Sequence, residues 1–177
     1  RRTAAASALA ARHLALPQAR RLLVVGTGRL APWMARAHVA LKPSLTEVTV
    51  WGRDSHRAQA VVRALRDDGI DACVAPDLAQ AVATAQVVTC ATTSGVPLVH
   101  GSWLAPGTHL DLVGGFRRGM REVDDAAVAR ARVVVDTYAG ALAEAGDLVQ
   151  PIEAGVVGRS HVLADLAELL RGDRSVR

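Results

Sequence analysis

The sequence predicts an α/β domain in which a parallel β-sheet is covered by helices on both faces. Short apolar runs that end in glycine alternate with segments of helical spacing along almost the whole chain. Half of the 177 residues are apolar, which is enough to bury a sizeable core, and only 3% are aromatic, so alanine, valine and leucine must form that core. Strands separated by helices of this length are typical of parallel sheets.

The first half of the chain is expected to open with a helix over residues 3–16. Apolar runs that end at glycine or at small residues predict the strands, because strands buried on both faces are apolar throughout. These strands are expected at residues 22–25, 48–51, 71–75 and 86–91. Helical spacing, with Pro43 as a stop and Asp54 as a cap, predicts helices from 30 to 41, from 55 to 65 and from 78 to 85.

The second half continues the alternation with two further strands, at residues 109–113 and 132–136. Helices are expected over 124–130, 139–145 and 162–170. Repeats, low-complexity linkers and changes of composition are not found, so residues 1–177 are predicted to form one domain. The abrupt start and end around a single sheet suggest that this domain is part of a longer chain.

Charge and composition exclude several classes of protein. The net charge is +4, yet the arginines are scattered without aromatic neighbours, which argues against nucleic-acid binding and suits a small phosphate-bearing ligand. Apolar runs are far shorter than a membrane helix, and a cytoplasmic protein is expected. The spacing of the histidines and of Cys73 and Cys90 fits neither a metal site nor a redox pair, so both cysteines are expected to be buried and reduced.

A glycine motif follows the first predicted strand. Gly26, Thr27, Gly28, Arg29, Leu30 and Ala31 form G-x-G-x-x-A between that strand and the next helix. Gly26 suits a tight turn, Gly28 lets the backbone approach a pyrophosphate, and Ala31 allows the helix to pack closely on the strand. The helix N-terminus then faces the anion with its free N–H groups. The motif predicts a dinucleotide-binding turn; an ordinary glycine turn is the alternative.

The end of the second strand indicates which dinucleotide is bound. An acidic residue there binds the ribose 2′-hydroxyl, whereas arginine favours a 2′-phosphate. Arg53, Ser55 and Arg57 favour NADP, with NAD as the alternative, while Asp54 repels a phosphate unless it points away as the helix cap. The alternative is that Arg53 is an ordinary solvent-exposed arginine after a strand and has no role in binding.

Small and hydroxyl residues follow the fourth strand at Ala91, Thr92 and Thr93. They are predicted to line the crevice at the carboxyl ends of the strands, where the ribose and nicotinamide lie, although an ordinary polar loop is an equal alternative. Candidate catalytic residues are not identified, because none of the histidines has a recognisable partner and neither Ser94 nor Ser102 lies in a nucleophile elbow.

Taken together, several segments resemble the ornithine cyclodeaminase/mu-crystallin family, and the resemblance covers the whole chain. They are residues 2–10, 26–31, 51–53, 103–109, 113–115 and 120–122. The resemblance implies that the chain is the NAD(P)-binding Rossmann domain, a three-layer doubly wound sheet, without the second domain that handles substrate and dimerisation. It implies that Arg2 binds the substrate carboxylate, which a guanidinium fork matches well. It also places Thr3 and Val113 with the cofactor-binding residues.

One departure from the family's pattern narrows the expected reaction. Ornithine cyclodeaminases carry an aspartate directly after Gly114 and Gly115 for proton transfer, and this chain has Phe116. The chain therefore looks like the bacterial ketimine reductases, which reduce Δ1-pyrroline-2-carboxylate or Δ1-piperideine-2-carboxylate to proline or pipecolate. Relatives often have serine or threonine where this chain has Asp54, which weakens the NADP assignment.

The alternatives are an ornithine cyclodeaminase, an alanine dehydrogenase and a non-catalytic, mu-crystallin-like NADPH-binding protein. A small imino or amino acid is the expected partner of the site, with neither nucleic acid nor membrane, and the full-length protein is expected to be a homodimer. Arginine and alanine enrichment suggests a bacterial source.

Overall fold

In the computed structural model, which describes residues 2–173 and 176, the chain divides into two compact units. The first unit comprises residues up to Thr92 together with Trp103–Val113, and the second comprises Thr93–Ser102 and the residues from Gly114 onward. Arg1 and Arg177, the ends of the predicted domain, lie outside the described residues.

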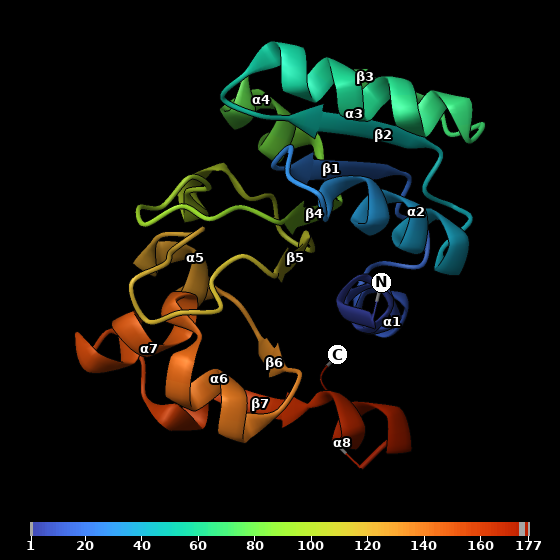
Figure 1. Cartoon of the computed structure of the whole chain (residues 1–177). Helices are drawn as coiled ribbons and strands as arrows, with labels where there is room; N and C mark the ends of the chain where they lie inside the picture. Colours follow the sequence, from blue (N-terminus) through green and yellow to red (C-terminus); the bar gives the residue numbers. More distant parts are fainter. Residues whose placement is uncertain (1, 174–175, 177) are drawn as a thin grey trace. The chain divides into compact units, whose positions relative to one another are not determined.

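The first unit alternates helices and strands as expected (Figure 1). Its elements are α1 (Arg2–Leu14), β1 (Arg21–Val25), α2 (Ala31–Leu41), β2 (Glu47–Trp51), α3 (Ser55–Asp67), β3 (Ala72–Val74), α4 (Leu78–Thr84), β4 (Val87–Cys90) and β5 (His109–Leu112). The strands form one parallel sheet in the order β3-β2-β1-β4-β5. This is the doubly wound order, in which the direction of winding reverses between β1 and β4.

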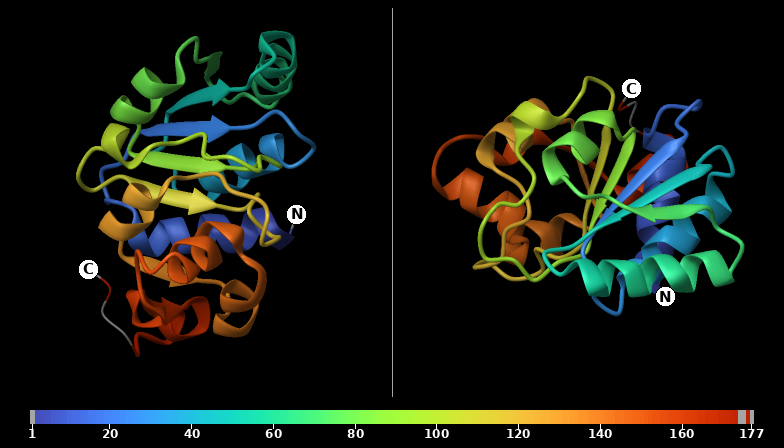
Figure 2. Two further views of the ribbon diagram at one scale, coloured as in Figure 1. Left: turned by 90° about the vertical axis from the view of Figure 1, so that its left-hand side faces the viewer. Right: turned by 90° about the horizontal axis from the view of Figure 1, so that it is seen from above.

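The helices of the first unit lie on both faces of this sheet. The helices α1, α2 and α3 lie on one face and α4 lies on the other (Figure 2). The core beneath α2 and α3 is built from small aliphatic side chains, in keeping with the low aromatic content. It includes Leu22, Val24, Ala35, Val50 and Leu65, all fully buried. The strands β1 and β4 are buried almost throughout, which explains why they read as continuous apolar runs.

Short side chains begin the helices where the sequence predicts. The side chain of Asp54 accepts hydrogen bonds from the backbone N–H groups at the start of α3, and Asp77 does the same for α4. Pro32 occupies an early position of α2, where its missing N–H costs nothing.

The second unit contains α5 (Asp125–Arg130), β6 (Val133–Val135), α6 (Tyr138–Glu144), α7 (Gly146–Glu153), β7 (Val162–Asp165) and α8 (Leu166–Arg171). Short 3₁₀ turns lie at Gly101–Trp103, where the two units meet along the chain, and at Arg159–His161. Among the described residues, none of the helices has the length and apolar content of a membrane-spanning segment.

Three expectations for these elements are wrong. The sixth predicted strand forms β6, but it pairs with β7 in a separate two-stranded sheet rather than joining the five strands. The segment predicted as a helix over 162–170 begins as β7, with Val162 and Ala164 buried and Leu163 exposed, and becomes helical only after Asp165 caps α8. The helix α7 was not expected, because Gly146 and Pro151 weaken its helical signal.

The expectation that both cysteines are buried is also wrong for one of them. Cys90 is buried in β4, which lies between β1 and β5, but Cys73 is exposed. Cys73 lies in β3, a three-residue strand that is outermost in the sheet. An outermost strand has a neighbouring strand on one side only, so its side chains are less fully covered. Neither cysteine forms a disulfide bond.

Candidate nucleotide-binding edge

The register of the sheet brings most of the predicted site residues to the carboxyl ends of the strands, which we call the nucleotide-binding edge. Val25 of β1 pairs with Trp51 of β2 and with Cys90 of β4, which in turn pairs with Leu112 of β5. The residues that follow these four are Gly26, Gly52, Ala91 and Val113. Three backbone hydrogen bonds continue the ladder past the strand ends, from Gly26 to Trp51, from Ala91 to Val25 and from Val113 to Cys90. The predicted residues of four separate segments therefore follow one row of the sheet, at its carboxyl ends.

The glycine turn between β1 and α2 has the geometry that its motif predicts. Gly26 has φ +124°, and a Cβ atom there would lie 2.6 Å from the carbonyl oxygen of Ala91, so this position requires glycine. Gly28 is exposed, and a Cβ atom there would face open space. The turn is therefore tightly packed on its inner side at Gly26 and open to a ligand at Gly28.

The N-terminus of α2 faces this open side. Leu30 precedes the helix and makes no side-chain hydrogen bond to its first turn, because a leucine side chain has no polar atom. Thr27 packs with its methyl group against Gly52, where a Cβ atom would overlap it. Arg29 is exposed beside the turn. The start of α2 follows Gly26 and Gly28 and has no side-chain cap. Its free N–H groups can therefore bind a phosphate group.

The segment after β2 presents positive charge at the same edge. Arg53, Ser55 and Arg57 are exposed around the start of α3. The Oδ1 atom of Asp54 accepts hydrogen bonds from the N–H groups of His56 at 2.9 Å and Arg57 at 3.2 Å, and its Oδ2 lies 3.6 Å from Nε of Arg57. The charge of Asp54 is therefore engaged by the helix start and by Arg57.

The remaining predicted residues are distributed between both units. Ala91, Thr92 and Val113 are half-buried at the carboxyl ends of β4 and β5, in the first unit. Thr93 is exposed and belongs to the second unit. Arg2 and Thr3 are exposed at the start of α1, and the N-terminal end of this helix lies at the edge toward which the strand arrows point (Figure 2). The start of α1 therefore lies at the same edge of the first unit as the glycine turn.

Four polar side chains lie close together in the first unit, and sequence reasoning did not assign them to the candidate site. Asp111 and His109 are on β5, His38 is on α2, and Lys42 directly follows α2. Burial lowers the pKa of His109 to about 4; the carboxylate of Asp111 opposes this shift, while His38 and Lys42 add to it. His109 therefore stays neutral through the physiological range, unlike an exposed histidine.

The loop after Gly114 in the second unit is held by two buried carboxylates. The Oε2 atom of Glu122 accepts a hydrogen bond from the N–H of Gly114 at 2.7 Å. The Oδ1 atom of Asp147 accepts from the N–H groups of Glu122 at 2.7 Å and Val123 at 3.0 Å. Burial raises the pKa of Asp147, against the opposing effects of these hydrogen bonds and of Arg121. Sequence reasoning missed the hydrogen bonds by which Asp147 holds this loop, because its partners are 24 and 25 residues away.

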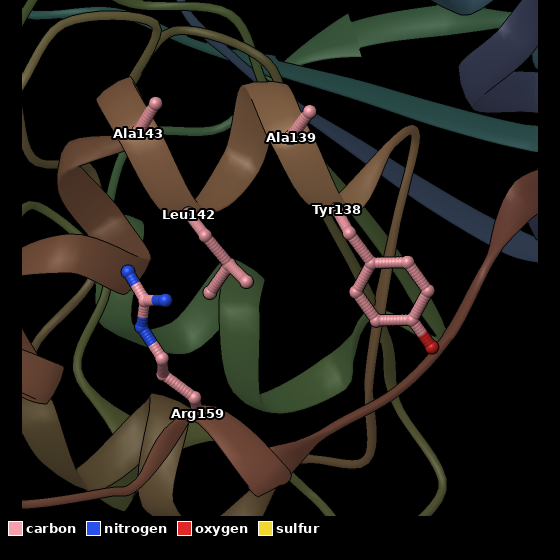
Figure 3. Close-up of a pocket in the computed structure, with 5 residues that line it drawn as sticks. All are labelled: Tyr138, Ala139, Leu142, Ala143 and Arg159. Carbon is pink, nitrogen blue, oxygen red and sulfur yellow. The ribbon is translucent and has the colours of Figure 1, made fainter.

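A shallow hollow on the second unit shares none of these residues. It has a volume of about 320 Å³ and is lined by Tyr138, Ala139, Leu142, Ala143 and Arg159 (Figure 3). The hydroxyl of Tyr138 donates to Glu168 at 2.9 Å, so the polar atom at one end of the hollow is engaged. Groups of three or more potential metal-ligating side chains do not occur among the described residues.

Comparison with known proteins agrees with this geometry. The model of the ornithine cyclodeaminase/mu-crystallin family matches residues 1–177. The chain is 43% identical over 172 residues to a Delta(1)-pyrroline-2-carboxylate reductase of Paracoccus denitrificans, covering 96% of this chain and 54% of that protein. The chain spans about half the length of the curated relatives it matches.

Solved structures give the same result. The Delta(1)-pyrroline-2-carboxylate reductase of Thermococcus litoralis, in complex with NADH and L-proline, superposes with a TM-score of 0.94 at 29% identity, over 98% of this chain and 54% of that one. An archaeal alanine dehydrogenase dimer with bound NAD has a TM-score of 0.92 at 28% identity, over 98% and 53% of the two chains. With sequence, fold and edge geometry in agreement, this chain belongs to the ornithine cyclodeaminase/mu-crystallin family.

Proposed function

We propose that this chain is the NAD(P)-binding domain of a two-domain reductase that converts a cyclic imino acid, Δ1-pyrroline-2-carboxylate or Δ1-piperideine-2-carboxylate, to proline or pipecolate. The observation that carries the proposal is the turn at Gly26 and Gly28, closed on one side and open on the other, at the point where the sheet reverses its winding. Dinucleotides bind at such switch points in open α/β sheets. The 43% identity to a reductase of this substrate supports the choice of reaction.

The residues present fit a dinucleotide. The open space at Gly28 admits the pyrophosphate, and the uncapped start of α2 supplies N–H groups and the positive end of the helix dipole. Thr3, Thr27, Arg29 and Leu30 complete the proposed pyrophosphate region. When bound, the reduced nicotinamide supplies the hydride. Ala91, Thr92, Thr93 and Val113 are the residues proposed to border that end of the cofactor.

The preferred cofactor in this proposal is NADP rather than NAD. Arg53, Ser55 and Arg57 are exposed donors beside the proposed adenosine site, and Asp54 is engaged at the start of α3. The objection that Asp54 repels a 2′-phosphate is thereby reduced, because its Oδ1 oxygen already accepts two backbone hydrogen bonds. NADH and NAD occur in the two solved relatives, so NAD is the competing assignment.

Arg2 is the proposed anchor of the substrate carboxylate. It begins α1 at the nucleotide-binding edge, and its guanidinium can pair with a carboxylate through two parallel hydrogen bonds. Such an anchor aligns the imine carbon with the hydride donor and lowers the entropic cost of reaction. The imine nitrogen must also receive a proton, whose donor we do not assign to this chain.

Two other activities of the family compete with this one. Phe116, where cyclodeaminases carry an aspartate for proton transfer, favours reduction over ornithine cyclodeamination. Similarity to the archaeal alanine dehydrogenase keeps reduction of a linear imine, formed from pyruvate and ammonia, as the second candidate. A non-catalytic NADPH-binding protein is the third. We further propose that the full-length protein is a homodimer, as the archaeal alanine dehydrogenase is a dimer, and that it is cytoplasmic.

The proposal is tested by titrating the two-domain protein with NADPH and NADH, followed by nicotinamide fluorescence, and by assaying turnover. Oxidation of NADPH with Δ1-pyrroline-2-carboxylate, and not with pyruvate plus ammonia, supports the proposal. Turnover only with pyruvate and ammonia establishes the alanine dehydrogenase instead. Tight NADPH binding without turnover of either substrate establishes the binding protein.

A further inference from the structure

Four elements of the first unit meet at one carboxylate oxygen. The Oδ2 atom of Asp111, on β5, accepts hydrogen bonds from the hydroxyl of Ser7 on α1 and from the hydroxyl of Thr89 on β4, the latter at 2.6 Å. The same oxygen lies 3.6 Å from Nε2 of His38 on α2. Nδ1 of His38 is 2.9 Å from the carbonyl oxygen of Met34 one turn earlier and donates to it, which fixes the orientation of the ring.

Ser7 gives α1 a polar attachment that its other buried residues cannot provide. The buried face of the helix consists of Ser7 and the alanines Ala4, Ala8 and Ala11. Methyl groups form shallow ridges, so apolar packing alone opposes sliding or rotation of this helix only weakly. A hydrogen bond from Ser7 to a carboxylate is directional and charge-assisted, and it fixes both the height of α1 along the strands and its rotation.

We infer that Asp111 is a positioning residue that sets the place of Arg2 relative to the nucleotide-binding edge through its hydrogen bond to Ser7. This inference rests on the proposed function for the role of Arg2. Ser7 lies five residues after Arg2, which is a rise of roughly 7.5 Å along the helix. Asp111 lies two residues before Val113, the proposed neighbour of the nicotinamide. Asp111 thus links α1, which carries the proposed substrate anchor Arg2, to β5, which leads into the proposed cofactor neighbour Val113.

The location of the contact argues for positioning rather than for general stability alone. Thr89, which is fully buried, aims its hydroxyl at the same oxygen and so holds the carboxylate in the orientation that Ser7 needs. The side chain of Asp111 is only 11% exposed, and a carboxylate so largely withdrawn from water is a costly way to stabilise a helix that an apolar side chain could hold. Hydrogen bonds to a carboxylate are directional, whereas apolar contacts are not. Direction matters here because Arg2 must meet the substrate carboxylate in a defined geometry.

The test compares Ser7→Ala with three substitutions at two strand threonines, Thr89 and Thr49. Thr89→Val removes the hydroxyl that orients Asp111, and Thr89→Ser keeps it. Thr49→Val is the matched control, because the hydroxyl of Thr49 bonds to the carbonyl of Leu22 in the neighbouring strand and not to Asp111. The readouts are amide hydrogen exchange in α1 and α3 of this chain, and the KM for Δ1-pyrroline-2-carboxylate with the NADPH Kd in the two-domain protein.

Positioning predicts that Ser7→Ala and Thr89→Val each speed exchange in α1 and raise the substrate KM about fivefold, while the NADPH Kd changes less than twofold. Thr89→Ser and Thr49→Val leave all three quantities near their original values. A role in stability alone would speed exchange in α1 and α3 together and leave the substrate KM unchanged.

Two results overturn the inference. The first is unchanged exchange in α1 for both Ser7→Ala and Thr89→Val. The second is faster exchange without a change in KM, in a protein whose KM does rise on Arg2→Ala. If the unsubstituted protein does not turn over the substrate, the proposed function fails, and exchange in α1 then decides whether Asp111 holds the helix.

Discussion

The Oδ1 atom of Asp54 accepts a hydrogen bond from the N–H of His56 at 2.9 Å, so this carboxylate serves as the cap of α3. An acidic residue at the end of the second strand ordinarily binds the ribose 2′-hydroxyl of NAD. Here its oxygen is engaged by the helix, and Arg53 and Ser55 on either side are left exposed at the proposed 2′-phosphate site.

We expect Arg53→Ala to weaken NADPH binding about tenfold and NADH binding less than twofold, because loss of a charge-assisted hydrogen bond costs about 1.5–3 kcal/mol. The measurement is a fluorescence titration of each cofactor. Arg63→Ala, an equal charge change at an exposed position further along α3, should leave the ratio of the two affinities unchanged. Equal losses of NADPH and NADH affinity on Arg53→Ala would contradict the NADP assignment.

Gly28→Ala separates cofactor binding from folding. Nothing lies within 4 Å of a Cβ atom at Gly28, so the added methyl group should shift the thermal midpoint by no more than about 2 °C. The same methyl group occupies the space proposed for the pyrophosphate, and NADPH affinity should fall at least about tenfold. Gly119→Ala, which also faces open space, is the control and should bind NADPH normally. Retained affinity in Gly28→Ala would show that the pyrophosphate does not approach this turn.

Arg2→Ala addresses the substrate anchor in the two-domain protein. Removing a guanidinium that pairs with a carboxylate should raise the substrate KM by about tenfold to a hundredfold, and the NADPH Kd should stay within about twofold. Steady-state kinetics and cofactor titration give the two numbers. Arg12→Ala, an exposed arginine at the other end of the same helix, is the matched control. Parallel losses of substrate and cofactor affinity would count against Arg2 as the anchor.

The stability of the chain should depend on pH through His109. Its pKa is about 4 in the folded chain, because burial disfavours the charged ring, against an ordinary value of 6.5. As the pH falls below 6.5 the unfolded chain takes up a proton that the folded chain does not accept until near pH 4. The free energy of unfolding is therefore highest above pH 6.5 and falls by up to about 3 kcal/mol between pH 6.5 and 4.

Urea unfolding at pH 7.0 and at pH 4.5 measures this difference. His109→Asn should reduce the loss of stability between the two pH values, whereas His56→Asn, at an exposed position, should preserve it. An equal loss in His109→Asn and in the unsubstituted chain would assign the pH dependence to other groups.

Gly115→Ala should destabilise the second unit. A Cβ atom at Gly115 would overlap Oδ2 of Asp147, and that buried carboxyl cannot move without losing its hydrogen bonds to Glu122 and Val123. Overpacking of this kind costs about 1–3 kcal/mol. Gly119→Ala in the same loop should change the free energy of unfolding by less than about 0.5 kcal/mol. Chemical denaturation compares the two, and equal stability of both variants would show that Asp147 does not restrain the loop.

Local patterns were sufficient where a segment's structure depends on its own residues. The strands β1, β2 and β4, the turn at Gly26 and the cap at Asp54 all follow from apolar runs, glycine placement and short acidic side chains. The same patterns failed for β7, where Val162, Leu163 and Ala164 suit a helix as well as a strand until β6 supplies the pairing partner. A short apolar segment is compatible with either a helix or a strand, because the partners of its backbone hydrogen bonds depend on the neighbouring segments in the fold.

By itself the sequence determined the doubly wound sheet of the first unit, the glycine turn and the family, since these rest on periodicity and on short contiguous motifs. Tertiary structure alone decided that Asp147 holds a loop some 25 residues away and that Asp111 joins α1 to β5 over 104 residues of chain. The physical reason is that a buried carboxylate must find donors wherever the fold brings them, and donors far along the chain leave no pattern in the sequence.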